Sequence, residues 1–480
     1  MMLPKLTGAN QTMADPARRT GWRGLLLGGA AVVALATGFV LPSPVSAQTL
    51  SEALALAYET NPVLQAQRAR LRETDESLAQ ALSNWRPTVS VSGEIGKTTT
   101  EVERFGNEDT QSSNTRTPSR ATFAVNQPLY RGGRTTAETD RAEASIQAQR
   151  AQLVSTEQQV FLRAATAYMN VIRDEATLEL RVNNVQRLQR QLEATGDQFN
   201  VGEVTRTDVA QSEARLAQSQ ADRVAAEGQL AASREGFIQV VGIAPTRLSE
   251  PNVPLDTPED REAVLAEAAR NNPNVLTQRF SIDSVAAQTR QIFGETLPQV
   301  TLSAEVSRFE NQQLRDSRTD EASIFATVSV PLYQSGSVSS RVRQSKQQEM
   351  RAQNALEDAR RTAVSDAAAA YDNLEAAKAR IDSLVTVIGA AEIALDGVQE
   401  EAKVGSRTIL DILDAEQELL NAQVNLVSAQ RDEIVYKLQL QTAIGHLTAR
   451  DLGLQVQLYD FEKHYRETRG RWWGFDISED

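Results

Sequence analysis

Two long stretches of the chain carry apolar residues at steps of three, four or seven positions. Neither stretch contains proline, so each is expected to form one continuous helix, over Thr135 to Asn200 and over Val338 to Lys403. This spacing makes a narrow apolar seam that packs against another helix, as in a coiled coil. Helices of this length span on the order of 100 Å. The seam residues are Leu178, Val182, Val185, Leu192 and Phe199, and then Leu384, Ile388, Ala391, Leu395 and Val398.

Four shorter stretches show an alternation of apolar and polar residues, which predicts strands. The second, ATFAVNQ, alternates less cleanly and is expected to end at Pro128, and the fourth to end at Pro331. The expected apolar faces are Val89, Val91 and Ile95, then Val300, Leu302 and Val306, then Ile324, Val328 and Val330. The polar faces include Thr88, Ser90, Ser92 and Glu94, then Thr301, Ser303 and Glu305.

Strands of about ten residues with one apolar face fit an outer-membrane barrel. A small soluble β-domain that caps the helices is the alternative. Four strands are too few to close a barrel, which needs about eight, and an open sheet in lipid would leave unpaired edges. Either several chains share one barrel, or the sheet lies outside the membrane.

The chain is an internal duplication. Asn61-Pro62 recurs as Asn272-Pro273, 211 residues later, and Pro128-Leu129-Tyr130 recurs as Pro331-Leu332-Tyr333, 203 residues later. The first copy therefore holds eight extra residues, within the polar stretch from Lys97 to Arg120, which is expected to be an exposed loop. Each copy is expected to begin with a helix of about 34 residues, from Leu50 to Asn84 and from Arg261 to Glu295.

The predicted organisation has five parts. Residues 1–47 read as a secretory signal peptide, with a basic region, an apolar run and a small-residue cleavage site before Gln48. A transmembrane anchor is the alternative for this segment. The first repeat then covers 48–247, a linker 248–260, the second repeat 261–448 and a C-terminal tail 449–480. The tail's RGRWWGF segment either packs on the helices or is disordered.

Composition narrows the possible chemistry. The chain has no cysteine and only two histidines, which argues against disulfides, thiolate catalysis and His- or Cys-based metal sites, and no cofactor is expected. The net charge is −13, and removal of a leader of charge +3 would leave −16, which argues against a nucleic-acid partner. The low aromatic content of 5% favours long helices with narrow seams over a bulky core.

Two related glycine phrases occupy equivalent places in the repeats. VGEVTRTDVAQSEA begins at Val201, and VGSRTILDILDAEQ begins at Val404. Each is expected to turn the chain between two helices, with Gly202 and Gly405 in the left-handed conformation. The candidate caps of the following helices are Thr207 or Asp208, and Thr408 or Asp411.

The pair Asp411 and Asp414 lies on one helix face because the residues are three positions apart. A solvated helix face is the ordinary interpretation of such a pair. A carboxylate-pair hydrolase is disfavoured, since nothing in the surrounding sequence forms a pocket and histidine is nearly absent.

The duplicated unit, the NP near each start, the QPLY and VPLY strand ends and the two glycine phrases together resemble the TolC family of outer-membrane efflux proteins. The resemblance covers about Gln48 to Leu447. It implies a mainly α fold with a membrane β-barrel, in which long coiled-coil-like helices form a periplasmic tunnel. Four strands per chain would contribute to a shared twelve-stranded barrel of a homotrimer in outer-membrane lipid.

The resemblance also implies roles for individual residues. Asp411 and Asp414 match an aspartate pair that lines the narrowest point of the tunnel, where a ring of crowded carboxylates favours cations and is expected to have raised pKa values. Arg407 matches a latch that bonds Thr207 and Asp208 of the other turn. Ala402 stands where the family's well-known examples have a tyrosine, so a tyrosine link of the latch is absent.

The implied function is a passive exit duct, not an enzyme, gated at its periplasmic tip and serving an efflux pump or a type I secretion system. A periplasmic adaptor would dock at Val201, Gly202, Val404 and Gly405, and an inner-membrane pump or ABC transporter would supply the cargo. Glu94 and Glu305 would face the barrel lumen. A soluble periplasmic coiled-coil adaptor or scaffold is the alternative function, and the alternating strands argue against it.

Overall fold

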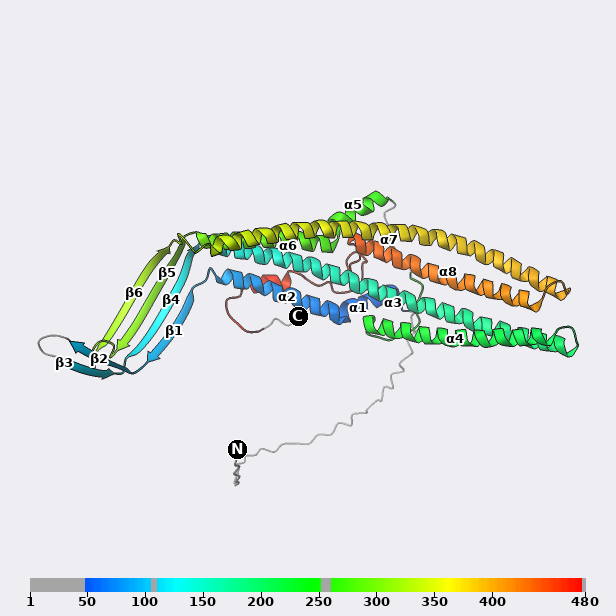
Figure 1. Ribbon diagram of the computed structural model, residues 1–480, viewed down its shortest axis with the longest axis horizontal. Coiled ribbons are helices and arrows are strands. Elements are labelled where there is room, and N and C mark those ends of the chain that lie inside the picture. The colour runs from blue at the N-terminus through cyan, green and yellow to red at the C-terminus, as the bar shows by residue number, and fades with distance from the viewer. Residues whose placement is uncertain (1–47, 105–109, 252–259, 477–480) are drawn as a thin grey trace, which may run out of the picture. The chain divides into compact units, whose positions relative to one another are not determined.

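The computed structural model describes residues 48–104, 110–251 and 260–476. The predicted signal peptide, most of the predicted linker and the last four residues lie outside this range. Within it, Figure 1 shows a sheet at one end of a group of long helices and two helical turns at the opposite end.

The two halves of the chain repeat one order of elements, which confirms the duplication (Figure 1). The first half contains α1 (Leu50–Thr60), α2 (Pro62–Ser83), β1 (Thr88–Ile95), β2 (Thr98–Arg104), β3 (Thr110–Arg116), β4 (Ser119–Arg131), α3 (Arg134–Asn200) and α4 (Arg206–Val241). The second contains α5 (Arg261–Asn271), α6 (Pro273–Phe293), the short 3₁₀ helix η1 (Gly294–Thr296), β5 (Gln299–Glu310), β6 (Arg318–Ser329), α7 (Ser337–Lys403) and α8 (Ile409–Ile444). The tail adds α9 (Lys463–Gly470).

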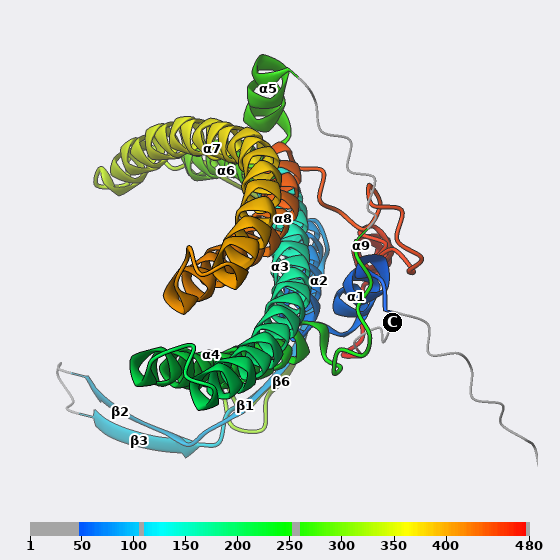
Figure 2. The same ribbon diagram turned by 90° about the vertical axis from the view of Figure 1, so that its right-hand side faces the viewer.

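The two proline-free stretches form the longest helices, as predicted. Both α3 and α7 have 67 residues. Each packs along the helix that follows it, α3 with α4 and α7 with α8, and α3 also packs against α6 and α8. Figure 2 shows these helices in an arc, with α1 and α9 on its convex side. Among the helices of the described ranges, none is both long and apolar enough to cross a membrane.

The prediction of one helix at the start of each repeat was wrong, because the NP pair interrupts both helices. The side chain of Asn61 accepts a hydrogen bond from Val63 N, and that of Asn272 accepts one from Asn274 N, so each asparagine caps the helix that the proline begins. Proline cannot continue a helix through its own position, but it suits the first turn.

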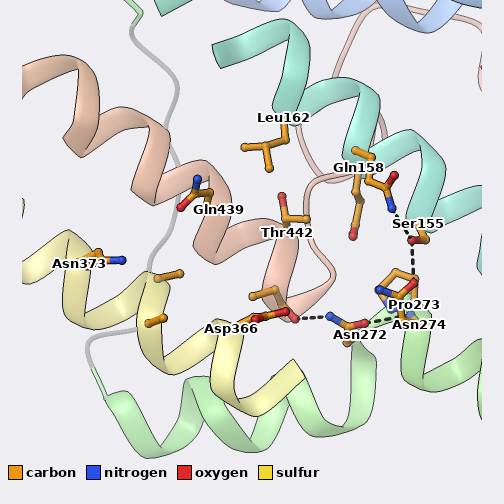
Figure 3. A pocket seen from close by; sticks show the side chains of 14 residues that line it. Ser155, Gln158, Leu162, Asn272, Pro273, Asn274, Asp366, Asn373, Gln439 and Thr442 are labelled. Carbon is orange, nitrogen blue, oxygen red and sulfur yellow. Dashed lines mark hydrogen bonds between the residues drawn. The ribbon is translucent and has the colours of Figure 1, made fainter. Parts of the chain in front are cut away.

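Each of these asparagines also forms a hydrogen bond to the last long helix of its repeat, α4 for Asn61 and α8 for Asn272. Asn61 Nδ2 donates to Val240 O at 2.9 Å, and Asn272 Nδ2 donates to Ala443 O at 3.0 Å. Figure 3 shows Asn272 beside a cavity of about 360 Å³, where Asn274 accepts a hydrogen bond from Ser155 of α3. The duplicated NP pair is therefore a joint between helices.

The four predicted strands form one antiparallel sheet in the order β1-β4-β5-β6. Pairing of Val89 with Val125 and of Leu302 with Ala326 places the predicted apolar residues on one face. Pairing of Glu94 with Arg120 and of Glu305 with Ser323 places polar residues on the other. The sheet thus has one apolar and one polar face, and β1 and β6 are its open edges.

Three details of the strands differ from the predictions. The polar stretch expected to be a loop contains the hairpin β2–β3, because its Thr-rich segments pair in register. Strand β4 runs past Pro128 to Arg131 with a shift in register between Pro128 and Tyr130, which accommodates the missing N–H of proline. Strand β6 ends at Ser329, before Pro331.

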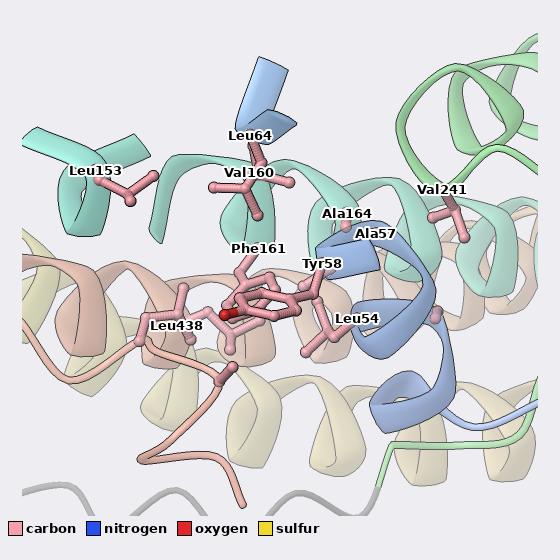
Figure 4. Close-up of a cluster of buried hydrophobic side chains, with 14 of the residues drawn as sticks. Leu54, Ala57, Tyr58, Leu64, Leu153, Val160, Phe161, Ala164, Val241 and Leu438 are labelled. Carbon is pink, nitrogen blue, oxygen red and sulfur yellow. The ribbon is translucent and has the colours of Figure 1, made fainter. Parts of the chain in front are cut away.

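The main hydrophobic core lies in the middle of the first repeat (Figure 4). Tyr58 of α1 and Phe161 of α3 pack with ring centroids 6.1 Å apart, and both are buried. The C-terminal tail completes this core, because Ala449 is buried in it, Tyr459 and Phe461 pack against it, and α9 packs on α2. Packing on the helices is therefore correct for the tail as far as α9, whereas in the RGRWWGF segment the side chains of Trp472, Trp473 and Phe475 are exposed.

Candidate aperture at the helical turns

The two glycine phrases form turns of the same geometry. Gly202 has φ 83° and Gly405 has φ 80°, the left-handed conformation that glycine adopts without strain. After each long helix, N–H groups of the turn return to its last carbonyls: Glu203 N donates to Gln198 O, and Ser406 N donates to Glu401 O. A Cβ at either glycine would meet open space, so the backbone conformation is the reason for glycine here.

A threonine and an aspartate start each returning helix. Thr205 N donates to Asp208 Oδ2 at 2.8 Å, and Asp208 N donates back to Thr205 Oγ1 at 3.3 Å. Thr408 and Asp411 make the same reciprocal pair at 2.9 Å and 3.3 Å. These are capping boxes. Thr408 is a cap as predicted, whereas Thr207 is not, because Thr205 occupies that position.

The capping role of Asp411 fixes the direction of its pKa. Its carboxylate accepts hydrogen bonds from the backbone N–H and the hydroxyl of Thr408, and these donors lower the pKa below the ordinary aspartate range. The expected raised pKa is therefore not found for Asp411 in this chain, since donors to the charged form outweigh desolvation.

Asp414 is paired with a residue that the sequence analysis missed. Arg215 Nη2 on α4 donates to Asp414 Oδ1 on α8 at 2.5 Å. This bond links the hairpin of α3 and α4 to the hairpin of α7 and α8 near their turns. The 203-residue offset aligns Arg215 with Glu418, so the repeats carry opposite charges at this position. That reversal is the signal in the sequence that could have identified Arg215.

A buried carboxylate, Glu416, lies two residues further along α8. The Glu416 side chain is 7% exposed, and burial raises its pKa, while Arg187 and Arg190 of α3 oppose that rise. Glu416 of α8 thus interacts electrostatically with two arginines of α3, and it was also missed by the sequence analysis.

Arg407, the predicted latch, bonds within its own hairpin. Its Nε donates to Glu401 Oε2 at 2.8 Å, and Asp208 is occupied by Thr205. The bond from Arg407 to Thr207 and Asp208 is thus not made inside one chain, and it stays a prediction about another arrangement of the turns.

The predicted adaptor contacts lie at the ends of the hairpins. Val201 is 72% exposed and Val404 is 79% exposed, each next to its glycine. Figure 1 shows both turns at the end of the helices remote from the sheet. Each turn thus presents one exposed valine, and the role of these residues in docking stays a prediction.

The glutamates predicted to face the lumen lie on the polar face of the sheet. Arg120 Nη2 donates to Glu305 Oε1 at 2.9 Å, and Glu94 pairs with Arg120 across β1 and β4. The same face carries the hydrogen bond between Thr122 and Ser307. The polar face is thus a connected set of charged and hydroxyl groups, and its exposure to a lumen stays a prediction.

Two features of the described residues bear on catalysis. No group of three or more His, Cys, Asp or Glu side chains in them could hold a metal ion. The cavity of about 360 Å³ between α3, α6, α7 and α8 is lined mainly by amides, hydroxyls and alanines. Asp366 is the only carboxylate among its lining residues.

Comparison with known proteins gives concordant results. The model of the family "Outer membrane efflux protein" matches residues 53–242 and 264–446, one match in each repeat. The chain is 34% identical over 451 residues to the outer membrane efflux protein BepC of Brucella suis, which covers 92% of this chain and 96% of that protein. It is 30% identical over 311 residues to the outer membrane protein TolC of Escherichia coli, covering 62% and 63%.

A solved structure shares the fold. The outer membrane protein VceC of Vibrio cholerae superposes with a TM-score of 0.71 at 22% identity, covering 82% of this chain and 96% of that one. The alternating sheet, the hairpins and the repeats are therefore those of a channel fold, and the soluble scaffold is not supported.

Proposed function

Because this chain belongs to the outer membrane efflux protein family and is an outer-membrane channel, we propose that three copies close one twelve-stranded barrel and work as a passive exit duct. The observation that carries the proposal is the two-faced sheet. Its apolar face suits lipid and its polar face suits water, yet β1 and β6 leave unpaired edges that lipid does not tolerate. Pairing β6 of one copy with β1 of the next satisfies every edge.

The aperture of this duct lies at the helical turns. Three copies bring together three capping boxes with charged Asp411 and three Arg215–Asp414 pairs. Asp411 then provides the net negative charge that favours cations, while Arg215 neutralises Asp414. In this proposal Arg407 leaves Glu401 and bonds Thr207 and Asp208 when the aperture is latched.

The partners follow from the ends of the duct. The exposed pairs Val201–Gly202 and Val404–Gly405 form the docking surface for a periplasmic adaptor, because small and apolar residues let helix ends approach closely. An inner-membrane pump or ABC transporter provides the cargo and the energy, since a passive duct supplies neither.

The experiment is single-channel conductance of the purified protein in a planar bilayer. We expect a small cation-selective conductance whose selectivity falls in Asp411→Asn and falls further in Asp411→Asn/Asp414→Asn. Glu235→Gln, an exposed change near the end of α4 remote from the turns, is the control and keeps the wild-type selectivity. Unchanged selectivity in the double variant would reject the carboxylate ring, and a folded protein that never inserts would reject the duct.

A further inference from the structure

An aromatic and basic patch is formed by the C-terminal tail and the residues that follow α2. The channel function proposed above does not use this patch. The patch consists of Trp85, Arg86, Arg471, Trp472, Trp473 and Phe475. The side chains of Trp472, Trp473 and Phe475 are 71%, 86% and 95% exposed, which is unusual for three large aromatic residues within four positions.

The exposed rings are held in place by specific contacts. The guanidinium of Arg86 lies 4.6 Å from the centroid of the Trp472 ring, and Arg86 Nη1 donates to Arg471 O at 2.8 Å. Arg471 Nη1 in turn donates to Asp476 O at 2.7 Å, and Trp473 and Phe475 meet edge to face at 6.1 Å. The segment is thus fixed to the end of α2, and the aromatic side chains are presented outwards.

The patch lies next to the first barrel strand. Arg86 precedes the start of β1 at Thr88 by two residues, and Val89 on the apolar face is three residues away, about 10 Å of extended chain. Figure 1 shows the chain after α9 beside the end of α2 from which β1 departs. At the same end of the sheet Tyr130 and Tyr333 are also exposed.

We propose that this patch binds the phospholipid headgroup layer at the periplasmic side of the outer membrane and anchors the tail there. Tryptophan and tyrosine concentrate at membrane interfaces because their rings are apolar and their N–H and O–H groups are polar. Arg86 and Arg471 add two cations that suit lipid phosphates. Because Arg86 lies only three residues before Val89 of the apolar face, the same bilayer can reach both surfaces.

The distribution of tryptophan makes the proposal directly measurable. The chain has four tryptophans, Trp22 in the predicted signal peptide and Trp85, Trp472 and Trp473 in the patch. A Trp22→Phe/Trp85→Phe variant therefore emits only from Trp472 and Trp473, whether or not the leader is removed.

The experiment reconstitutes this full-length variant into phosphatidylethanolamine–phosphatidylglycerol vesicles that contain brominated phosphatidylcholine. We expect stronger quenching of the emission by lipid brominated near the headgroup than by lipid brominated near the chain ends. Aqueous iodide should quench less than it quenches the same protein in the presence of denaturant.

Two single-tryptophan reporters, each in a variant with Phe at all four native tryptophan positions, distinguish failure of the anchor from failure of barrel insertion. Val91→Trp, on the apolar face of β1, should be quenched by lipid if the barrel is inserted, and Val224→Trp, exposed on α4, should not. Quenching at position 91 without quenching of Trp472 and Trp473 would overturn the anchor and leave the channel intact. A blue-shifted emission without lipid quenching would assign the patch to a neighbouring subunit or protein, and would also overturn the proposal.

Discussion

At the scale of single residues, the bond between Arg215 and Asp414 bears on the charge of the proposed aperture. Because Arg215 neutralises a carboxylate beside the turns, its loss should make the channel more selective for cations. We expect Arg215→Gln to raise the cation-to-anion permeability ratio roughly two- to five-fold, since both groups are partly solvated and the pair is screened. Reversal potentials in a salt gradient measure the ratio, and Arg223→Gln, further along α4, is the control. A lower ratio in Arg215→Gln would contradict this assignment.

The lowered pKa of Asp411 predicts how cation selectivity depends on pH. Its pKa is lowered by the donors of Thr408, so the carboxylate stays charged as the pH falls to the ordinary aspartate pKa of about 3.9 and loses its charge only below that. Cation selectivity should therefore persist to about pH 4. Thr408→Val removes one donor and should move the loss of selectivity to higher pH. Loss of selectivity already near neutral pH in the wild type would show that crowding of carboxylates in the assembly dominates.

The residue scale is also where the sequence was least informative. The capping role of a threonine and an aspartate follows from their spacing before a helix, and Asp411 could be placed in this way. Thr205 was missed because Thr207 lies equally near the turn, and only the backbone hydrogen bonds distinguish the two. The partner of Arg215 could not be predicted from the sequence, since it depends on how the two hairpins lie against each other. The partner of Arg407 depends on how the turn folds back on the end of α7.

At the scale of elements, the asparagine of the NP pair both caps the helix that follows and bonds a neighbouring helix. Asn272→Ala removes the cap of α6 and the hydrogen bond to Ala443 O, and loss of such a cap costs about 1 kcal/mol. We expect a lower midpoint of thermal unfolding by circular dichroism. Asn421→Ala, at an exposed position inside α8, is the matched control and should change the midpoint little. An unchanged midpoint in Asn272→Ala would show that Pro273 alone defines the joint.

The tail is attached to the helices through a buried carboxylate. Glu157 Oε1 accepts a hydrogen bond from Ala449 N at 2.7 Å, and burial raises the pKa of Glu157. A raised carboxylate pKa means that the folded chain binds the proton more readily than the unfolded chain does. The contribution of Glu157 to the free energy of unfolding therefore falls as the pH rises from the unfolded-state pKa of about 4.3 through the raised pKa of the folded chain.

Two substitutions separate the charge from the hydrogen bond. Glu157→Gln keeps an acceptor for Ala449 N and should remove this part of the pH dependence without loss of stability at neutral pH. Glu157→Ala leaves the buried N–H unpaired and should cost about 1–3 kcal/mol. Thermal unfolding at several pH values measures both effects, and equal losses in the two variants would show that Glu157 acts through its charge.

Local patterns predicted most elements because the pattern and the packing agree. The long helices and the sheet could be predicted because apolar residues such as Leu178 and Val89 recur with the period of their element. That period arises because one side of each element is buried or faces lipid. The pattern failed at Asn61 and Asn272, where the cap and the proline outweigh helical periodicity. It also failed in the hairpin β2–β3, whose polar strands carry no apolar face to recognise.

At the scale of the whole molecule, a sheet with two open edges and two opposite faces is incomplete by itself. The chain contains no cysteine, so introduced cysteines report only the contacts chosen. If the copies join edge to edge, a variant with one cysteine on β1 and one on β6 should cross-link into covalent trimers, because each junction uses one strand of each kind. Ser92→Cys combined in turn with Ser323→Cys, Phe325→Cys and Thr327→Cys samples the register on the polar face.

The matched controls make the outcome specific. Each single-cysteine variant should remain uncross-linked, because β1 does not meet β1 and β6 does not meet β6 in a closed ring. The pair Val89→Cys/Val125→Cys, neighbours across β1 and β4 of the same chain, should cross-link without a change in oligomer size. Denaturing gels after treatment with a short bifunctional maleimide show the result. Dimers from the single variants, or no trimers from any double variant, would contradict a barrel closed by three copies.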